Sequence, residues 1–226
     1  MGPNPTPPLM KAIVVRSVLG ITGTFLAGVV FSVCLHGQEV PKAVIVTPTS
    51  PAQKEVENIG TAAIDRLAVS MVNEVRSALG GGEPEDALDI CHLKALPTIP
   101  GGIISGMPRI AAVKFTSLKI RASENGPDAA DKAALDYIDH ALSSGNAAPS
   151  VVVQRINAPD SPAEWRVYKP IGITSNCLAC HGDPSEQSPR LRGKLKAMYP
   201  EDQAIGYKSH DWRGVIRVTV SDGPEN

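Results

Sequence analysis

The sequence predicts an α+β protein, with helices packed on an antiparallel sheet and an N-terminal signal or anchor helix ahead of them. Over Lys54–Leu79 the apolar residues recur at three- and four-residue steps, which is the period of an amphipathic helix. Later segments alternate apolar and polar residues between Gly, Pro, Asn and Asp, as strands do. Some of these strands follow one another with no helix between them, which favours antiparallel pairing.

Four segments are predicted to be helices, and each has a recognisable start or stop. Three glycines end the first one, a proline follows the second, and Asp128 caps the third. The second carries Cys91 on an apolar face. The four segments are Lys54–Leu79, Pro84–Leu96, Asp128–Leu142 and Arg190–Ala197.

Four further segments are predicted to be strands. In the first, the apolar residues change phase near Ser117, which predicts a β-bulge there. The second and third are joined by a turn at Pro159–Pro162. The four segments are Ala111–Ser123, Ser150–Asn157, Glu164–Ile173 and Arg213–Val220.

The N-terminus predicts export from the cytoplasm. Lys11 and Arg16 precede the uncharged run Ser17–Leu35, the pattern of a secretory signal or a membrane anchor. We therefore expect residues 1–37 to be a signal peptide or anchor, with anchoring through residues 11–35 if it is retained. Residues 38–53 read as an extended linker and residues 54–222 as the folded domain, in the periplasm or another extracytoplasmic compartment.

Composition and charge exclude several classes of function. The formal net charge is −1 and aromatic residues make up 4% of the chain, so neither an electrostatic field for nucleic acid nor a base-stacking surface is indicated. No constellation of acid, base and nucleophile is visible. We expect a binding or redox protein, not an enzyme, and no nucleic-acid partner.

The motif that carries chemistry is C-x-x-C-H, formed by Cys177, Cys180 and His181. Three interpretations compete: covalent haem, part of a zinc site, or a redox dithiol. A dithiol does not require the histidine, and usually follows an early strand of a βαβ unit. Zinc could use Cys91 as a further ligand, but side chains of adjacent residues such as Cys180 and His181 diverge.

Covalent haem accounts for each residue of the motif. The two thiols add to the two vinyl groups on one edge of the porphyrin, and the two-residue spacer sets their separation. The histidine that follows then lies beneath the ring and coordinates iron. The motif therefore favours one covalently attached haem c, with thioethers at Cys177 and Cys180 and His181 on the iron.

The second iron ligand stays open on residue patterns alone. His140 is predicted to face solvent, His210 to lie in a polar surface turn, and Met198 to be core. Cys91 lies on an apolar helix face, where a cysteine is usually a small hydrophobic residue. The candidates are Cys91, His92, His140, His210, Met107 and Met198.

Seven segments in the same order resemble the Tll-type, PAS-like c-haem domain family. They are the helix segment around Cys91, Thr116–Arg121, Asn125–Asp128, Lys169–Ile171, Cys177–Gly182, Tyr199–Tyr207 and Arg213–Val218. The resemblance implies a PAS-like fold and a haem iron held by His181 and Cys91. Two departures are Phe115, where the family often has arginine, and Ala122-Ser123, where it often has Asn-Pro.

Two functions follow as expectations. The resemblance implies redox or diatomic-gas sensing, since in many relatives the domain is the extracytoplasmic input of a signalling protein. The alternative is a soluble periplasmic electron-transfer cytochrome. A sensor would have a gas or a signalling protein as its partner, and a carrier would have a redox protein.

Overall fold

The computed structural model describes residues 42–88, 104, 106–158, 161–221 and 223. All of these residues belong to one compact unit, Glu39–Asn226. The predicted signal or anchor segment and most of the predicted helix around Cys91 lie outside the described residues. Within the described part of the chain, no helix combines the length and apolar character needed to cross a membrane.

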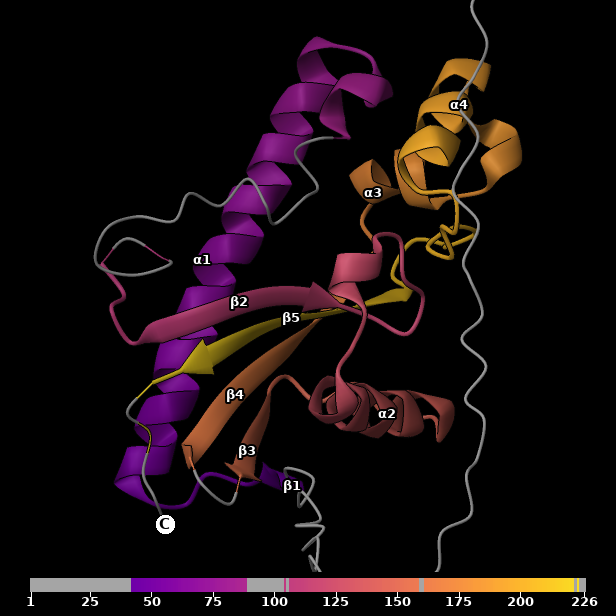
Figure 1. The fold of residues 1–226 in the computed structure, drawn as a ribbon. Coiled ribbons are helices and arrows are strands. Elements are labelled where there is room, and N and C mark those ends of the chain that lie inside the picture. The colour runs from indigo at the N-terminus through magenta and orange to yellow at the C-terminus, as the bar shows by residue number, and fades with distance from the viewer. Residues whose placement is uncertain (1–41, 89–103, 105, 159–160, 222, 224–226) are drawn as a thin grey trace, which may run out of the picture. The chain divides into compact units, whose positions relative to one another are not determined.

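A five-stranded antiparallel sheet forms the centre of the domain, with strand order β1-β3-β4-β5-β2 (Figure 1). The predicted α+β class, with a PAS-like antiparallel sheet flanked by helices, is confirmed. The strands are β1 (Lys42–Val46), β2 (Ile110–Thr116), β3 (Val152–Ala158), β4 (Ser161–Gly172) and β5 (Trp212–Val220).

Among the described residues, four α-helices accompany the sheet. Each of the predicted helices at Lys54–Leu79, Asp128–Leu142 and Arg190–Ala197 is present within a few residues of its predicted limits. The helices are α1 (Pro51–Gly81), α2 (Ala129–Ser143), α3 (Ser175–His181) and α4 (Pro189–Met198). Short 3₁₀ turns lie at Pro84–Ala87, Ser123–Asn125 and Pro184–Glu186.

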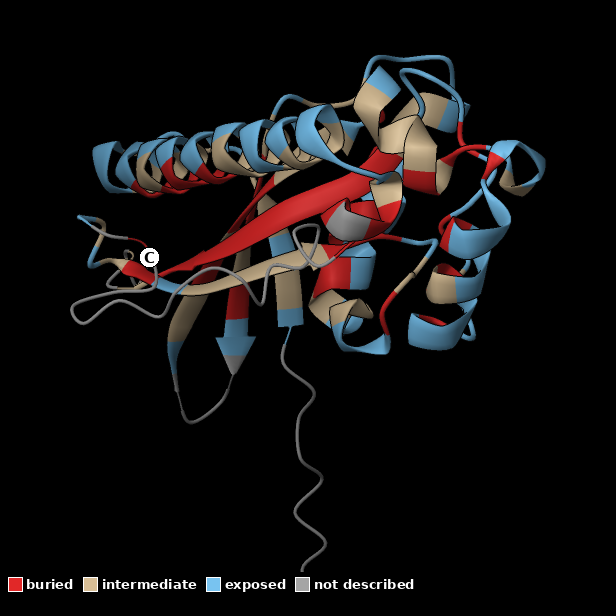
Figure 2. Cartoon of the chain, turned by 90° about the horizontal axis from the view of Figure 1, so that it is seen from above, coloured by how far each residue is buried: buried red, intermediate tan, exposed pale blue. Residues whose placement is uncertain are grey.

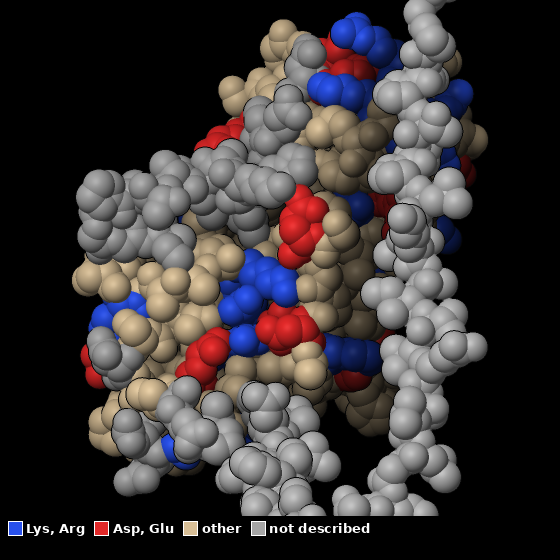
Figure 3. Space-filling model, viewed as in Figure 1, with Lys and Arg blue, Asp and Glu red and all other residues tan. Residues whose placement is uncertain are grey.

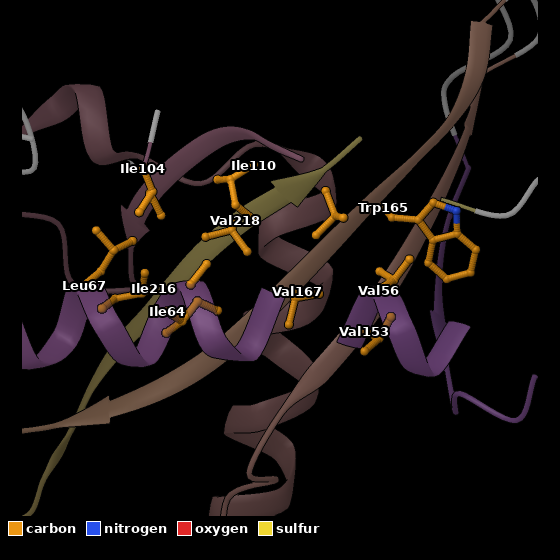
Figure 4. Close-up of a cluster of buried hydrophobic side chains, with 12 residues drawn as sticks. Val56, Ile64, Leu67, Ile104, Ile110, Val153, Trp165, Val167, Ile216 and Val218 are labelled. Atoms are coloured by element: carbon orange, nitrogen blue, oxygen red, sulfur yellow. The ribbon is translucent and has the colours of Figure 1, made fainter. Parts of the chain in front are cut away.

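The two faces of the sheet bury different helices, because successive side chains of a strand point to opposite faces. Val153, Val167 and Ile216 pack with α1 (Figure 4), whereas their neighbours Val152, Tyr168 and Val215 pack with α2. The central strands are therefore buried on both sides (Figure 2).

Helix α1 divides into two halves with different surroundings. A capping box formed by Ser50 and Gln53 starts the helix. The fully buried residues of α1 all lie in its first half, between Val56 and Leu67. Beyond Leu67 the helix extends past the sheet toward α3 and α4 (Figure 1), and its apolar side chains are only half-buried.

A buried carboxylate attaches α2 to the sheet. Asp131 is fully buried. Lys114 Nζ lies 3.0 Å from its Oδ2, and Arg166 Nη1 lies 3.1 Å from its Oδ1. Arg217 Nε is 3.4 Å from Oδ1, and the Tyr168 hydroxyl donates to the same oxygen over 3.2 Å.

The predicted linker and the first predicted strand need correction. The linker expected over residues 38–53 contributes β1, an edge strand paired with β3, and the first residues of α1. The first predicted strand ends at Thr116, because the Ser117 hydroxyl bonds to the Lys119 carbonyl and turns the chain away. Its register irregularity lies between Ile110 and Ala112, not near Ser117. Of the helix predicted at Pro84–Leu96, the described residues show a 3₁₀ turn over Pro84–Ala87.

Candidate functional site

The C-x-x-C-H motif lies on α3, the seven-residue helix between β4 and α4. The helix stops after His181, where the Gly182 amide donates to the Leu178 carbonyl over 2.8 Å. A Cβ at position 182 would lie 2.6 Å from that carbonyl oxygen, so a side chain there would displace the helix end. Gly182 thereby lets the chain turn directly behind His181.

The three motif residues line one cavity of about 300 Å³. An apolar stripe on the second half of α1 and residues of α3 line the cavity. The end of the sheet, the turn before α2 and Tyr199 close the remaining sides. The stripe consists of Ala68, Met71, Val72, Val75 and Leu79. Its three- and four-residue spacing places these side chains on one face of the helix.

His181 is held in one defined tautomer. Its Nδ1 lies 2.7 Å from the Ala204 carbonyl oxygen. Since a carbonyl only accepts, Nδ1 carries the proton and Nε2 keeps its lone pair. Burial, and then the positive charges of Arg121 and Arg213, lower the pKa of His181 to about 3. The imidazole is therefore neutral at physiological pH and able to coordinate a metal.

Arg121 fixes the loop that supplies this acceptor. Its Nε pairs with Asp202 Oδ2 at 2.9 Å, and both side chains are about nine-tenths buried. Its Nη2 donates to the carbonyl oxygens of Cys180 at 2.6 Å and Ala204 at 3.3 Å. One guanidinium thus ties the end of α3 to the loop that bonds His181.

Both motif cysteines are free thiols in this structure. Cys180 is buried, and this burial raises the pKa of its thiol. Cys177 is half-buried, with its Sγ 3.2 Å from the Thr174 hydroxyl. A redox dithiol depends on a thiolate with a lowered pKa. The burial of Cys180 instead raises its pKa, which disfavours the thiolate.

The described residues contain no group of three or more His, Cys, Asp and Glu side chains placed to hold a metal ion together. Cys177, Cys180 and His181 line the same cavity without converging on one point. A single imidazole in an apolar cavity with two thiols at its edge matches the donors that a covalent haem requires.

The candidates for a second iron ligand are now partly located. Cys91 and His92 lie outside the described residues. His140 and His210 are exposed, as predicted. Met107 packs against the core on the α1 face, and Met198 is 37% exposed.

The prediction that Met198 is core is therefore wrong. The buried stripe of α4 runs through Leu191, Leu195 and Tyr199, at four-residue steps. Met198 lies one residue before the last position of that stripe. A helix turns by about 100° per residue, which rotates Met198 toward solvent.

Met71 also lines the cavity, although it is not among the ligand candidates predicted above. It belongs to the apolar face of α1, whose period in the sequence indicates only an amphipathic helix. Its position on the half of α1 that extends past the sheet places its thioether at the site instead.

The comparisons agree with the predicted family. A sequence profile described as Tll0287-like matches residues 102–221, which is more than half of the chain. The chain belongs to the Tll0287-like family. The matched region holds the C-x-x-C-H motif, Arg121, Ala204 and Arg213, and it begins after Cys91.

One solved structure is similar to the chain. It is that of a cyanobacterial haem protein, Tll0287, with 22% sequence identity and a TM-score of 0.47, and the match covers 78% of this chain and 99% of that one. No curated protein matches.

Proposed function

We propose that this protein is an extracytoplasmic c-type haem protein without enzymatic activity. Thioether bonds at Cys177 and Cys180 would attach one haem, and His181 would bind its iron. The observation that supports the proposal is the tautomer of His181 and its place in the cavity. It lines an apolar cavity together with both cysteines, with Nδ1 donating to Ala204 and Nε2 free.

The residues around the cavity fit a porphyrin. The stripe on α1 and the side chains of Phe115, Ile171 and Ile173 are apolar, as a macrocycle requires. Met71 adds a soft thioether, while Arg121 and Arg213 add positive charge at one side. Haem bound here would supply a one-electron centre and an iron able to exchange a ligand.

Redox or diatomic-gas sensing is the role we propose for this haem, with Cys91 as the second iron ligand. The family membership supports it through the resemblance described above. A thiolate favours ferric iron and binds ferrous iron poorly, so Cys91 could leave on reduction. That exchange would move the segment that carries Cys91 and could signal to a partner protein.

An electron-transfer cytochrome is the second candidate, and Met71 favours it. His/Met ligation is common in electron-carrying cytochromes and raises the reduction potential. A thioether binds both oxidation states of iron, so such a site would keep both ligands. The two candidates therefore differ in the ligand opposite His181.

Covalent attachment is tested by expression with a c-type maturation system and the native N-terminus. The wild-type chain should gain the mass of one haem, retain it through acid–acetone extraction and be recovered from an extracytoplasmic fraction. Cys177→Ser with Cys180→Ser should lose the covalent haem. Cys34→Ser, outside the folded domain, is the matched cysteine control and should keep it. A zinc-loaded wild-type protein without a Soret band would refute the proposal.

A further inference from the structure

Arg213 is a buried cation in the wall of the cavity. It is only 7% exposed. Its Nη1 donates to the Ser117 hydroxyl over 2.6 Å and to the Lys119 carbonyl over 3.0 Å. The guanidinium also lies 5.2 Å from the centre of the Phe115 ring and 5.7 Å from that of Tyr207.

None of these four contacting groups carries a negative charge. Among the described residues, no carboxylate lies within ion-pairing distance of Arg213, and its Nε has no hydrogen-bond partner. Burial accordingly lowers the pKa of Arg213. A buried charge without a counter-charge costs several kcal/mol, so such groups are normally paired.

Arg121, which also lines the cavity, has the carboxylate partner that Arg213 lacks. Its guanidinium is bound to the Asp202 carboxylate and to two backbone carbonyls. The chain thus supplies a complete set of partners for one arginine of the cavity and no carboxylate, among the described residues, for the other.

A β-bulge turns Arg213 toward the cavity. Trp212 and Val215 both pack on the α2 face, although strand alternation would put residues three apart on opposite faces. Ile171 pairs with Gly214 and Gly172 pairs with Trp212, so Arg213 is the extra residue of the bulge, next to Gly214 with its φ of +148°. A Cβ at position 214 would lie 2.5 Å from the Thr116 carbonyl oxygen. Bulges commonly redirect a side chain beside a functional site.

We propose that Arg213 binds a carboxylate of the group held in this cavity. This inference rests on the proposed function, under which that carboxylate is a propionate of the haem. Propionates are the anionic groups of haem, and a guanidinium pairs with a carboxylate through two parallel hydrogen bonds. Arg213 would then fix how the attached haem is oriented in the cavity.

The first test measures coupling between Arg213 and haem. Unfolding temperatures of wild type and Arg213→Gln are compared in haem-loaded protein and in haem-free protein made without c-type maturation. Arg213→Gln should lower the unfolding temperature by several degrees more in the loaded form. Arg166→Gln is the matched control, with an equal loss in both forms, because Arg166 lies outside the cavity and its carboxylate partners Asp128 and Asp131 belong to the chain.

The second test uses only loaded protein, so it holds even if the haem-free chain does not fold. The propionate bending band in the resonance Raman spectrum reports hydrogen bonding to the propionates. The band should shift in Arg213→Gln, return largely in Arg213→Lys and stay unchanged in Arg166→Gln.

An unshifted band in Arg213→Gln, or an equal shift in Arg213→Gln and Arg166→Gln, would overturn the inference. Equal losses of unfolding temperature in loaded and haem-free Arg213→Gln would also overturn it, because they would place the carboxylate on the chain itself. Absence of haem from the wild type would instead defeat the proposed function, so the two failures are distinguishable.

Discussion

A single hydrogen bond decides what His181 can do. The Ala204 carbonyl accepts a hydrogen bond from Nδ1–H, which leaves Nε2 as the ring atom that could bind a metal. With its pKa lowered to about 3, His181 does not bind a second proton near neutral pH. Under the proposed function, protons would therefore compete little with iron for Nε2, and the hydrogen bond would also make the ring a stronger donor.

The identity of one side chain, the second iron ligand opposite His181, would distinguish the two candidate functions. Cys91, implied by the family resemblance, would give a site that changes ligand on reduction. Met71, which the structure places in the cavity wall, would give a site that keeps its ligand.

Replacing each candidate should change the haem spectrum in a different way. If Cys91 is the ligand, Cys91→Ala loses the low-spin ferric thiolate spectrum and its reduction potential rises, while Met71→Leu leaves the ferric spectrum unchanged. The ferrous wild type should then bind carbon monoxide. The measurement is absorption and EPR spectroscopy of both oxidation states, with and without the gas.

The opposite pattern supports a carrier. A ferrous wild type that stays six-coordinate, refuses carbon monoxide and has the same potential as Cys91→Ala would show that Cys91 is not a ligand. Loss of low-spin iron in Met71→Leu would then assign the thioether.

At the scale of elements, α2 is held by charge as well as by apolar contacts. Asp131 is central because three cations and a tyrosine hydroxyl converge on it. Removing one partner of a buried ion pair leaves the other charges uncompensated, which costs far more than losing a surface pair.

Asp131→Asn should therefore destabilise the domain by about 3–5 kcal/mol. The change removes the carboxylate and keeps nearly the same volume, so the loss comes mainly from Lys114 and Arg217, whereas Arg166 keeps its pairs with Asp128 and Glu164. Urea unfolding of haem-loaded protein, followed by circular dichroism, measures it.

Asp136→Asn on the exposed face of the same helix is the control. Asp136 pairs with Lys132 at 2.7 Å in solvent, and its loss should cost less than about 1 kcal/mol. Equal effects of the two variants would mean that the cluster around Asp131 does not hold α2.

At the scale of the whole molecule, the domain is a sheet covered by helices, with the cavity at one end of the sheet. The first half of α1 is buried on the sheet, while its second half exposes a half-buried apolar stripe to the cavity. On the face shown in Figure 3, basic and acidic side chains lie next to one another, without a broad surface of one sign. Steering of a partner by net charge is not indicated on that face.

The cavity should make the stability of α1 depend on its occupant. Haem attachment should slow amide hydrogen exchange over Ala68–Leu79, since the macrocycle would cover the stripe. Exchange over Val56–Leu67, already buried on the sheet, should change little. Exchange measured by mass spectrometry on loaded and haem-free chains tests this, and uniform protection along α1 would contradict it.

Local patterns in the sequence determined most of the elements and the chemistry of the motif. The apolar period of α1, the Asp128 cap of α2 and the C-x-x-C-H turn are each formed by residues close together in the chain. Such interactions can be recognised in the sequence because both partners appear within one or two helical turns. Cys177, Cys180 and His181 were therefore identifiable before the fold was known.

Contacts between distant segments were decided only by the tertiary structure. Arg213 bonds to Ser117 across 96 residues of chain, and Arg121 bonds to Ala204 across 83. No local pattern marks Asp131 as more than part of a capping box, Met71 as a cavity residue or Lys42–Val46 as an edge strand. Their roles depend on which elements pack together, and that depends on the combined burial of residues that are neighbours only after folding.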